Sequence, residues 1–169
     1  QETKMICPGQ SIAQIISAID LAKGSGTWDR RINLMQPKNV VELGTGEGYS
    51  GELIMEVLPD VATFTTIDYN YPSGHNYAGR LAKWKSDPRL LVLVGNTTDP
   101  SMVGKVPPDV DLLYIDTNHR AWHAALEMSI WQEVLCDGAI VVVDDLSEND
   151  MWLFWDSVPY EKHPEKVVP

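Results

Sequence analysis

Three aspartates and a histidine stand at the ends of two apolar runs in the second half of the chain. Asp116 and His119 follow the run DLLYI at 111–115, and Asp144 and Asp145 follow the run AIVVV at 139–143. If the two runs are neighbouring strands, about 5 Å apart, the three carboxylates surround one small volume. Because unpaired carboxylates repel one another, and Mg²⁺ accepts carboxylates together with waters and substrate oxygens, these residue types predict a magnesium site.

Other roles for these residues stay open. Asp144 or Asp145 could cap a helix formed by the stretch SENDMWLFW at 147–155, and His119 could cap the helix after it or lie on the surface. His119 and His123 have the spacing of one helix face and could share a zinc ion, although no third nitrogen or sulfur ligand is evident nearby.

A glycine-rich stretch, VVELGTGEGYSG at 40–51, follows an earlier apolar run. It lacks the lysine of a phosphate-binding P-loop. The dinucleotide pattern Gly-x-Gly-x-x-Gly also fails, because Tyr49 occupies the last glycine position when the count starts at Gly44. The pattern that fits is Glu42 followed by alternating glycines at 44, 46 and 48. Such glycines let the backbone turn sharply and approach a ligand closely.

Asp68 follows the apolar run at 62–67 and lies 24 positions after Gly44. A carboxylate at this point accepts hydrogen bonds from the hydroxyl groups of a ribose. It therefore predicts an adenosine-type ligand, without choosing between NAD and other cofactors.

Five apolar runs carry these residues, at 39–43, 62–67, 90–94, 111–115 and 139–143. Their β-branched, continuously apolar character is typical of strands covered on both faces. Stretches with helical spacing separate them, at 49–58, 76–87 and 119–135, with a shorter turn at 98–106. This alternation predicts an α/β fold with a doubly wound, mostly parallel sheet, whose ligands bind beyond the carboxyl ends of the strands. The helix at 119–135 is expected to bury a broad apolar face that includes Trp122, Leu126, Ile130 and Leu135.

The length of 169 residues predicts a single domain. Two helices are expected at 11–24 and 27–36, so that 1–37 forms an N-terminal helical part, 38–147 the ligand-binding core and 148–169 a short C-terminal segment. That segment has room for one helix and a strand at 158–163. The fifth or sixth strand would then be an exposed edge, which favours pairing with a second chain as a possible homodimer.

Composition narrows the classes of partner. The net charge of −11 disfavours binding to nucleic acid or to an anionic membrane. No apolar stretch reaches the ~18 residues of a membrane span, and the first residues do not resemble a signal peptide. Because Cys7 and Cys136 form neither a disulfide framework nor a metal-binding pair, we expect a soluble, cytoplasmic protein.

The pattern from Glu42 to Gly48, with the following Tyr49 and Ser50, resembles motif I of the class I S-adenosylmethionine-dependent methyltransferases. The acidic ends of the fourth and fifth strands resemble those of the metal-dependent O-methyltransferases. The likeness is to the macrocin and mycinamicin sugar enzymes with their cephalosporin-hydroxylase-like relatives, and more distantly to the catechol and caffeoyl-CoA type. The resemblance covers about residues 38 to 147 and implies a Rossmann-like sheet of order 3-2-1-4-5 with a shortened C-terminal end.

The resemblance also implies roles for individual residues. Ser50, at a helix start, would contact the methionine carboxylate, Asn96 the adenine edge, and His119 would be the general base. The metal would be held by Asp116, Asp144 and Asp145. The residues expected to contact S-adenosylmethionine are Glu42, Gly44, Thr45, Gly46, Tyr49, Ser50, Asp68, Tyr69, Asn96, Thr97 and Asp116.

We therefore expect an O-methyltransferase that acts on a small hydroxylated molecule, such as a sugar or polyol. Mg²⁺ would lower the pKa of the substrate hydroxyl, His119 would take its proton, and the oxygen would attack the sulfonium methyl group. The alternatives are a metal-independent methyltransferase with another acceptor and a catalytically silent S-adenosylmethionine-binding protein. A dehydrogenase comes last, and the stretch DTNH at 116–119 lacks the motif of enzymes that methylate nucleic acid amino groups.

Overall fold

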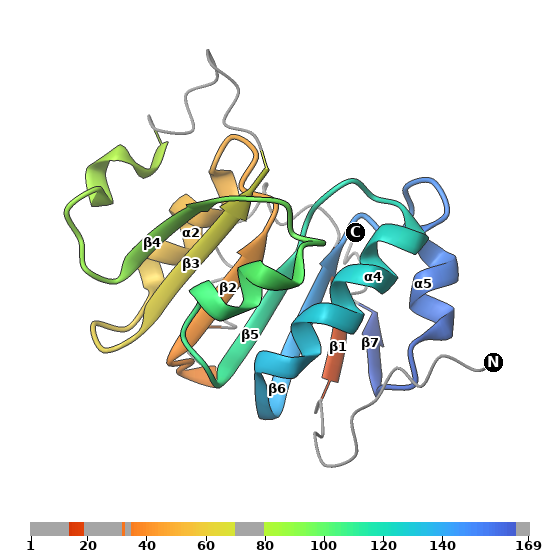
Figure 1. Ribbon diagram of the computed structural model, residues 1–169. Helices are drawn as coiled ribbons and strands as arrows, with labels where there is room; N and C mark the ends of the chain where they lie inside the picture. Colours follow the sequence, from red (N-terminus) through yellow and green to blue (C-terminus); the bar gives the residue numbers. More distant parts are fainter. Residues whose placement is uncertain (1–13, 19–31, 33–34, 70–79, 165–169) are drawn as a thin grey trace, which may run out of the picture.

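A single parallel sheet organises the part of the chain that the computed structural model describes, residues 14–18, 32, 35–69 and 80–164 (Figure 1). The order of its seven strands is β4-β3-β2-β5-β6-β1-β7. Their bounds are β1 Gln14–Ala18, β2 Asn39–Leu43, β3 Thr63–Asp68, β4 Leu90–Val94, β5 Val110–Ile115, β6 Leu135–Asp144 and β7 Lys162–Pro164.

Strands β2 to β6 are the five strands that the sequence predicts. Their order in the sheet, β4-β3-β2-β5-β6, is the expected 3-2-1-4-5. All neighbouring pairs among them are parallel, so the residues that follow each strand meet along one edge of the sheet. The α/β fold class is therefore confirmed.

The helix expected at 11–24 is wrong over its described part. Gln14–Ala18 is a strand that pairs in parallel with β6, from Ile140 to Asp144. The β-branched Ile15 and Ile16 suit a strand, and the unpaired edge of β6 offers hydrogen-bond partners that override a local preference for helix. Within the stretch expected as the second helix, Ile32 and Met35 are helical. The other residues of both stretches lie outside the described residues.

The C-terminal segment completes the sheet from within the chain. Helix α5, Met151–Ser157, leads to β7, which pairs in parallel with β1. A strand within 158–163 is thus confirmed in part. Because β1 covers β6, the fifth of the expected strands is not an edge, whereas β7 ends the sheet among the described residues. The homodimer stays a prediction.

Helices cover both faces of the sheet (Figure 1). Helix α2, Tyr49–Val57, packs on one face over Val40, Phe64 and Leu112. On the other face lie α4, Ala121–Trp131, and α5, over a core that includes Val41, Leu113 and Val141. Short 3₁₀ helices complete the connections: η2 Ala82–Trp84, η3 Pro100–Lys105 and η4 Gln132–Val134. None of the helices in the described part has the length and apolarity that a membrane crossing needs.

The face that the sequence predicts for helix α4 is only partly buried, since Ile130 packs against the core and Leu135 is buried at the start of β6, outside the helix. Trp122 and Leu126 are 62% and 41% exposed, and the buried residues are Ala124, Glu127, Met128 and Trp131. Apolar residues occur around most of this helix, so periodicity alone does not choose the buried side. The small Ala124 permits close packing on the sheet, and polar partners at the site satisfy Glu127.

Gly44 joins the ends of three strands. Its backbone N–H donates to the carbonyl of Ile67 at 2.8 Å, and the N–H of Asp116 donates to the carbonyl of Leu43 at 2.9 Å. With φ at 96°, a Cβ on Gly44 would lie 1.9 Å from the carbonyl oxygen of Asp116. Gly46 has φ at 50°, but a Cβ there would meet no atom within 4 Å.

These two glycines give a matched pair of substitutions. We expect Gly46→Ala to lower the free energy of unfolding by about 1 to 2 kcal/mol, the usual cost of a left-handed backbone for an L-residue. Gly44→Ala adds a clash with backbone and should cost about 2 kcal/mol more, as overpacking does. Urea denaturation monitored by circular dichroism measures both losses, and equal losses would contradict the close approach to Asp116.

Candidate functional site

Two adjoining cavities lie along the carboxyl edge of the sheet. The larger, of about 390 Å³, is lined by Gly44, Gly46, Ile67, Asp68, Tyr69, Asn96, Thr97, Asp116, Thr117, Asn118 and His123. The smaller, of about 210 Å³, is lined by Gly44, Thr45, Gly46, Glu47, Tyr49, Ser50, Tyr114 and Asp116. Every residue that the sequence predicts for cofactor contact lines one of them, except Glu42.

Asp68 ends β3 and faces the larger cavity. Its Oδ2 accepts a hydrogen bond from the N–H of Gly46 at 3.0 Å, so the same carboxylate holds the glycine loop in place. Tyr69 beside it is 77% exposed. The position is the one expected for a residue that binds ribose hydroxyls.

The two residues predicted near the adenine differ in what they offer a ligand. The Oδ1 atom of Asn96 accepts from the N–H and hydroxyl of Thr98, at 3.0 and 2.8 Å, within its own turn. The hydroxyl of Thr97 donates to Glu127 at 2.5 Å. Both residues line the larger cavity, but only the amide NH₂ of Asn96 is left to face it.

Glu42 lies beneath the glycine loop and is fully buried. The hydroxyl of Ser50 donates to its Oε1, and the hydroxyl of Thr66 donates to its Oε2 at 2.5 Å. Burial raises the pKa of Glu42 to about 8, against the two hydrogen bonds, and the charge of Asp116 adds to the rise. Glu42 therefore reaches the smaller cavity through Ser50 rather than directly.

Asp116, Asp144 and Asp145 each lie beside one of two other side chains, His119 and Tyr114. His119 Nε2 lies 3.1 Å from Asp116 Oδ1, and its Nδ1 lies 3.5 Å from Asp145 Oδ2. The hydroxyl of Tyr114 donates to Asp144 Oδ2 at 2.7 Å and lies 3.2 Å from Asp116 Oδ2. The imidazole and the phenol thus stand between the carboxylates.

Burial and the neighbouring carboxylates raise the pKa values of Asp144 and His119. Burial, and then the negative charge of Asp116, raise the pKa of Asp144 to about 6. The hydrogen bond to Asp116 raises the pKa of His119 above 6.5, with the charge of Asp145 adding to it. Both shifts favour the protonated forms, so these carboxylates stabilise added positive charge.

The loop after β6 holds the loop after β5. The Nδ2 of Asn149 donates to the carbonyl of His119 at 3.1 Å, and the N–H of Ala121 donates to Oδ1 of Asp150 at 3.0 Å. His119, Asp145 and Asn149 have left-handed φ values of 48°, 48° and 49°. Helix α5 begins only at Met151, so the alternative in which Asp144 or Asp145 caps it is wrong.

The metal prediction has mixed structural support. The donors are hard oxygens of the kind that Mg²⁺ prefers. In the described ranges, however, no three His, Cys, Asp or Glu side chains converge as a ligand set. The zinc alternative fares no better, because Nε2 of His123 lies 3.0 Å from Glu127 rather than near His119.

Sequence reasoning gave no role at the site to Tyr114, Thr117, Asn118 and Glu127, and it considered His123 only as a zinc ligand. Tyr114 shares a strand face with Asp116, two positions on, and this spacing was a usable signal. Glu127 stands among apolar residues one helical turn after His123, which marks a carboxylate with a buried role.

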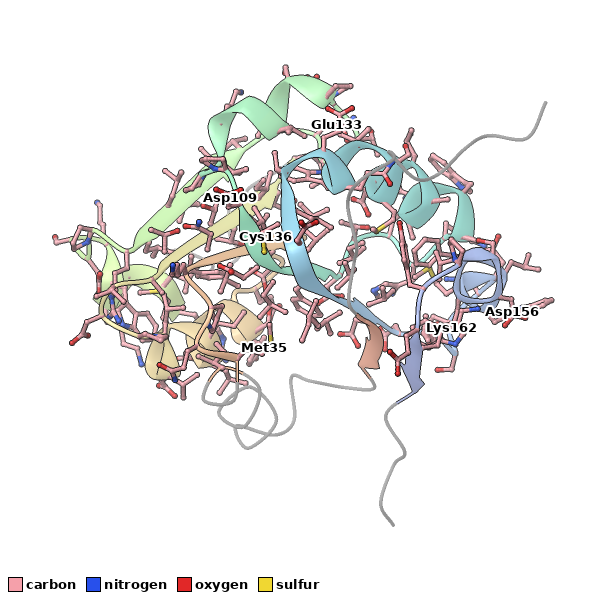
Figure 2. The ribbon with its side chains drawn as sticks, turned by 90° about the horizontal axis from the view of Figure 1, so that it is seen from below. Met35, Asp109, Glu133, Cys136, Asp156 and Lys162 are labelled. Carbon is pink, nitrogen blue, oxygen red and sulfur yellow. The ribbon has the colours of Figure 1, made fainter. Side chains whose placement is uncertain are left out.

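Cys136 is a free cysteine near the amino end of the sheet. Cys136 lies near the start of β6, beside Asp109 at the amino ends of the strands (Figure 2), whereas Asp144 ends the same strand. Burial raises the pKa of its thiol, which is a sign of an inert cysteine. Cys7 lies outside the described residues.

A family profile described as a methyltransferase domain matches residues 41–146. A comparison with curated protein sequences gives no match. The match to the profile begins within β2 and ends just after Asp145, so it contains the whole carboxyl edge described above.

Solved structures share the fold. They include the O-methyltransferase TomG from Streptomyces achromogenes in complex with S-adenosylmethionine, with a TM-score of 0.63 and 20% identity over 78% of this chain. The Podospora anserina methyltransferase PaMTH1, bound to S-adenosylhomocysteine, has a TM-score of 0.64 and 20% identity over 80%. A Bacillus cereus O-methyltransferase in complex with S-adenosylhomocysteine has a TM-score of 0.63 and 14% identity over 80%. The chain spans 66%, 58% and 61% of these proteins' own lengths.

Glu42 predicts how stability depends on pH. Its pKa rises from 4.5 to about 8 on folding, so between these values the folded protein holds a proton that the unfolded chain has released. The stabilising effect is complete below pH 4.5 and is lost as the pH rises through about 8. The free energy of unfolding of the wild type should therefore fall by up to ~1.4 kcal/mol per pH unit in this range. Because Gln does not titrate, Glu42→Gln should remove this fall.

Urea denaturation at several pH values measures this fall. Glu56→Gln is the matched control, since Glu56 is 47% exposed and paired with Lys83 at the surface. The control should retain the wild-type dependence. A wild-type slope that persists in Glu42→Gln would show that another group carries it.

Proposed function

Because its residues 41–146 match the methyltransferase domain family, to which the chain therefore belongs, we propose that it transfers the methyl group of S-adenosylmethionine to an oxygen of a small hydroxylated molecule. The observation that carries this proposal is the pair of cavities. All but one of the residues expected from the sequence to contact the cofactor line them.

The two cavities suit the two halves of the cofactor. Asp68 and Asn96 line the larger one, which we assign to the adenosine, with the ribose hydroxyls at Asp68. Ser50 and Tyr49 line the smaller one at the start of α2, which suits the methionine carboxylate. Gly44 and Gly46 line both, and the lack of side chains lets the ligand pass close to the backbone.

His119 is the proposed general base. Asp116 and Asp145 flank its two ring nitrogens, and Asp116 also lines both cavities, so the imidazole adjoins the proposed cofactor site. The base takes the proton of the acceptor hydroxyl, whose oxygen attacks the methyl carbon. The carbon–sulfur bond breaks, and its electron pair stays on sulfur, which becomes the neutral thioether of S-adenosylhomocysteine.

Carboxylates dominate the rim of this site. They accept hydrogen bonds from hydroxyl groups and repel anions, and the chain carries a net charge of −11. We therefore propose a neutral acceptor rich in hydroxyl groups, such as a sugar or polyol, in keeping with the resemblance to the sugar O-methyltransferases.

We also propose that the reaction depends on magnesium. The raised pKa of Asp144 supports it, because a cation would relieve the repulsion between the carboxylates. Asp116, Asp144 and Asp145 would hold the ion, and bound Mg²⁺ would lower the pKa of the acceptor hydroxyl. Their oxygens bond Tyr114, His119 and the N–H of Asp145 in this structure, so the bonds would have to rearrange.

Replacement of His119 tests the proposed reaction. A panel of sugars and polyols is assayed for methyl transfer from labelled S-adenosylmethionine, and the best acceptor is kept. His119→Ala should lower kcat/KM by about 10²- to 10⁴-fold, the usual contribution of a general base. The dissociation constant for S-adenosylhomocysteine, measured by calorimetry, should change little.

The wild-type pH profile adds an independent readout. Only the neutral imidazole accepts a proton, so kcat/KM should rise with pH through a pKa above 6.5 and level off beyond it. Binding of NAD without binding of S-adenosylhomocysteine would overturn the proposed cofactor. Cofactor binding without methyl transfer to any acceptor would support the catalytically silent alternative.

A magnesium titration tests the metal separately. Calorimetry on the wild type should show Mg²⁺ binding, and Asp144→Asn should weaken it at least about tenfold, since one charged ligand is lost. Asp137→Asn, on the same strand at its amino end, is the matched control and should bind as the wild type does. No binding in the wild type, with activity retained in EDTA, would establish the metal-independent alternative.

A further inference from the structure

The proposed reaction leaves one buried carboxylate without a role. Glu127 of α4 is fully buried and bonds three side chains. It accepts from the hydroxyl of Thr97 at 2.5 Å, from the hydroxyl of Thr117 at 2.9 Å and from Nε2 of His123 at 3.0 Å. These three partners all line the larger cavity. The carboxylate thus ties together three pieces of the cavity wall from behind.

The carboxylate also decides which ring nitrogen of His123 carries a proton. A carboxylate only accepts hydrogen bonds, so Nε2 of His123 must be its donor. In the neutral ring, Nδ1 is then an acceptor. The atom that lies 3.0 Å from Nδ1 is Nδ2 of Asn118, and the amide NH₂ is the end that can donate to it.

This chain of bonds fixes the orientation of the Asn118 amide. An asparagine amide can turn over and exchange its donor and acceptor ends, unless a neighbour requires one of them. With one N–H of its amide donated to His123, Asn118 has its carbonyl Oδ1 turned to the other side as an acceptor. Asn118 lines the larger cavity, so it offers an acceptor there.

Further contacts hold the chain of bonds rigid. Nε1 of Trp131 donates to the carbonyl of Thr97 at 2.8 Å. The ring of Trp122 meets that of His123 edge to face, with centroids 5.2 Å apart. The bond between Thr97 and Glu127 is buried, whereas the bond between Asn118 and His123 lies at the surface, so the network is held most firmly at its inner end.

We propose that Asn118 determines specificity for the nucleobase of the cofactor, and that Glu127 and His123 are positioning residues that hold its carbonyl toward the base. This inference rests on the proposed function, which assigns adenosine to the larger cavity. A fixed carbonyl accepts a hydrogen bond from the exocyclic amino group of adenine and opposes the oxygen of a 6-oxopurine. The free NH₂ of Asn96 offers a donor from another part of the same wall, which suits a ring nitrogen of adenine.

The test compares S-adenosylhomocysteine with S-inosylhomocysteine, which differ by the replacement of the amino group with an oxygen and a ring proton. Calorimetry gives the ratio of their dissociation constants for each protein. The wild type should prefer the adenosyl compound by about 100-fold or more, as sites built to pair with a polar group do. Asn118→Leu should reduce the ratio at least tenfold.

Further variants distinguish a role of His123 in positioning the Asn118 amide from a role in packing alone. His123→Phe keeps an aromatic ring but frees the Asn118 amide, and it should also reduce the ratio at least tenfold. Asn118→Asp keeps acceptor oxygens and should retain most of the preference for adenine, as a conservative rescue. Glu56→Gln, at the surface, should leave the ratio unchanged. Circular dichroism verifies that each variant folds.

The outcomes distinguish a failure of this inference from a failure of the proposed function on which it rests. If the wild type binds neither compound, the proposed function fails. If it binds S-adenosylhomocysteine and the ratio is the same in the wild type, Asn118→Leu and His123→Phe, the inference fails and the function stands. A loss of affinity for both compounds by the same factor in His123→Phe would show a structural role alone, and would likewise overturn it.

Discussion

Gly44 meets the backbone of Asp116 where β2 and β5 end side by side, and this contact sets the geometry of the whole site. A Cβ on Gly44 would lie 1.9 Å from the carbonyl oxygen of Asp116, so any other residue would push the two loops apart. Asp116 in turn lines both cavities and lies 3.1 Å from His119. The position of the proposed base relative to the glycine loop therefore depends on the absence of one side chain.

Two buried glutamates support the cavities from behind, by different means. Glu42 takes hydroxyl donors from Ser50 and Thr66, yet burial still raises its pKa to about 8. Glu127 accepts from two hydroxyls and an imidazole at the other end of the site. Buried carboxyl groups need such partners, and here most of the partners are wall residues themselves. Glu42 thus fixes one residue that lines a cavity, Ser50, and Glu127 fixes three.

The sequence could predict what depends on periodicity and on the ends of strands. Five apolar runs predicted β2 to β6, and the resemblance to the methyltransferases implied their order. All but one of the expected cofactor contacts line a cavity, because the residues after parallel strands meet at one edge. It could not predict β1, since Gln14–Ala18 becomes a strand only through its pairing with β6. Nor could it predict the role of Glu127, because periodicity placed Trp122 and Leu126 inside, and the choice of the buried face of α4 depends on tertiary contacts.

The loops around His119 are held in one shape before any ligand arrives. His119, Asp145 and Asn149 all have left-handed backbones, each at a cost of about 1 to 3 kcal/mol. The bond from Asn149 to the carbonyl of His119, and that from Ala121 to Asp150, tie the loop after β6 to the loop after β5 and offset this strain. A base that must lie within hydrogen-bond reach of a hydroxyl gains from such rigidity, because the cost of ordering it is met on folding rather than on binding. This strain supports the proposal that His119 is the base.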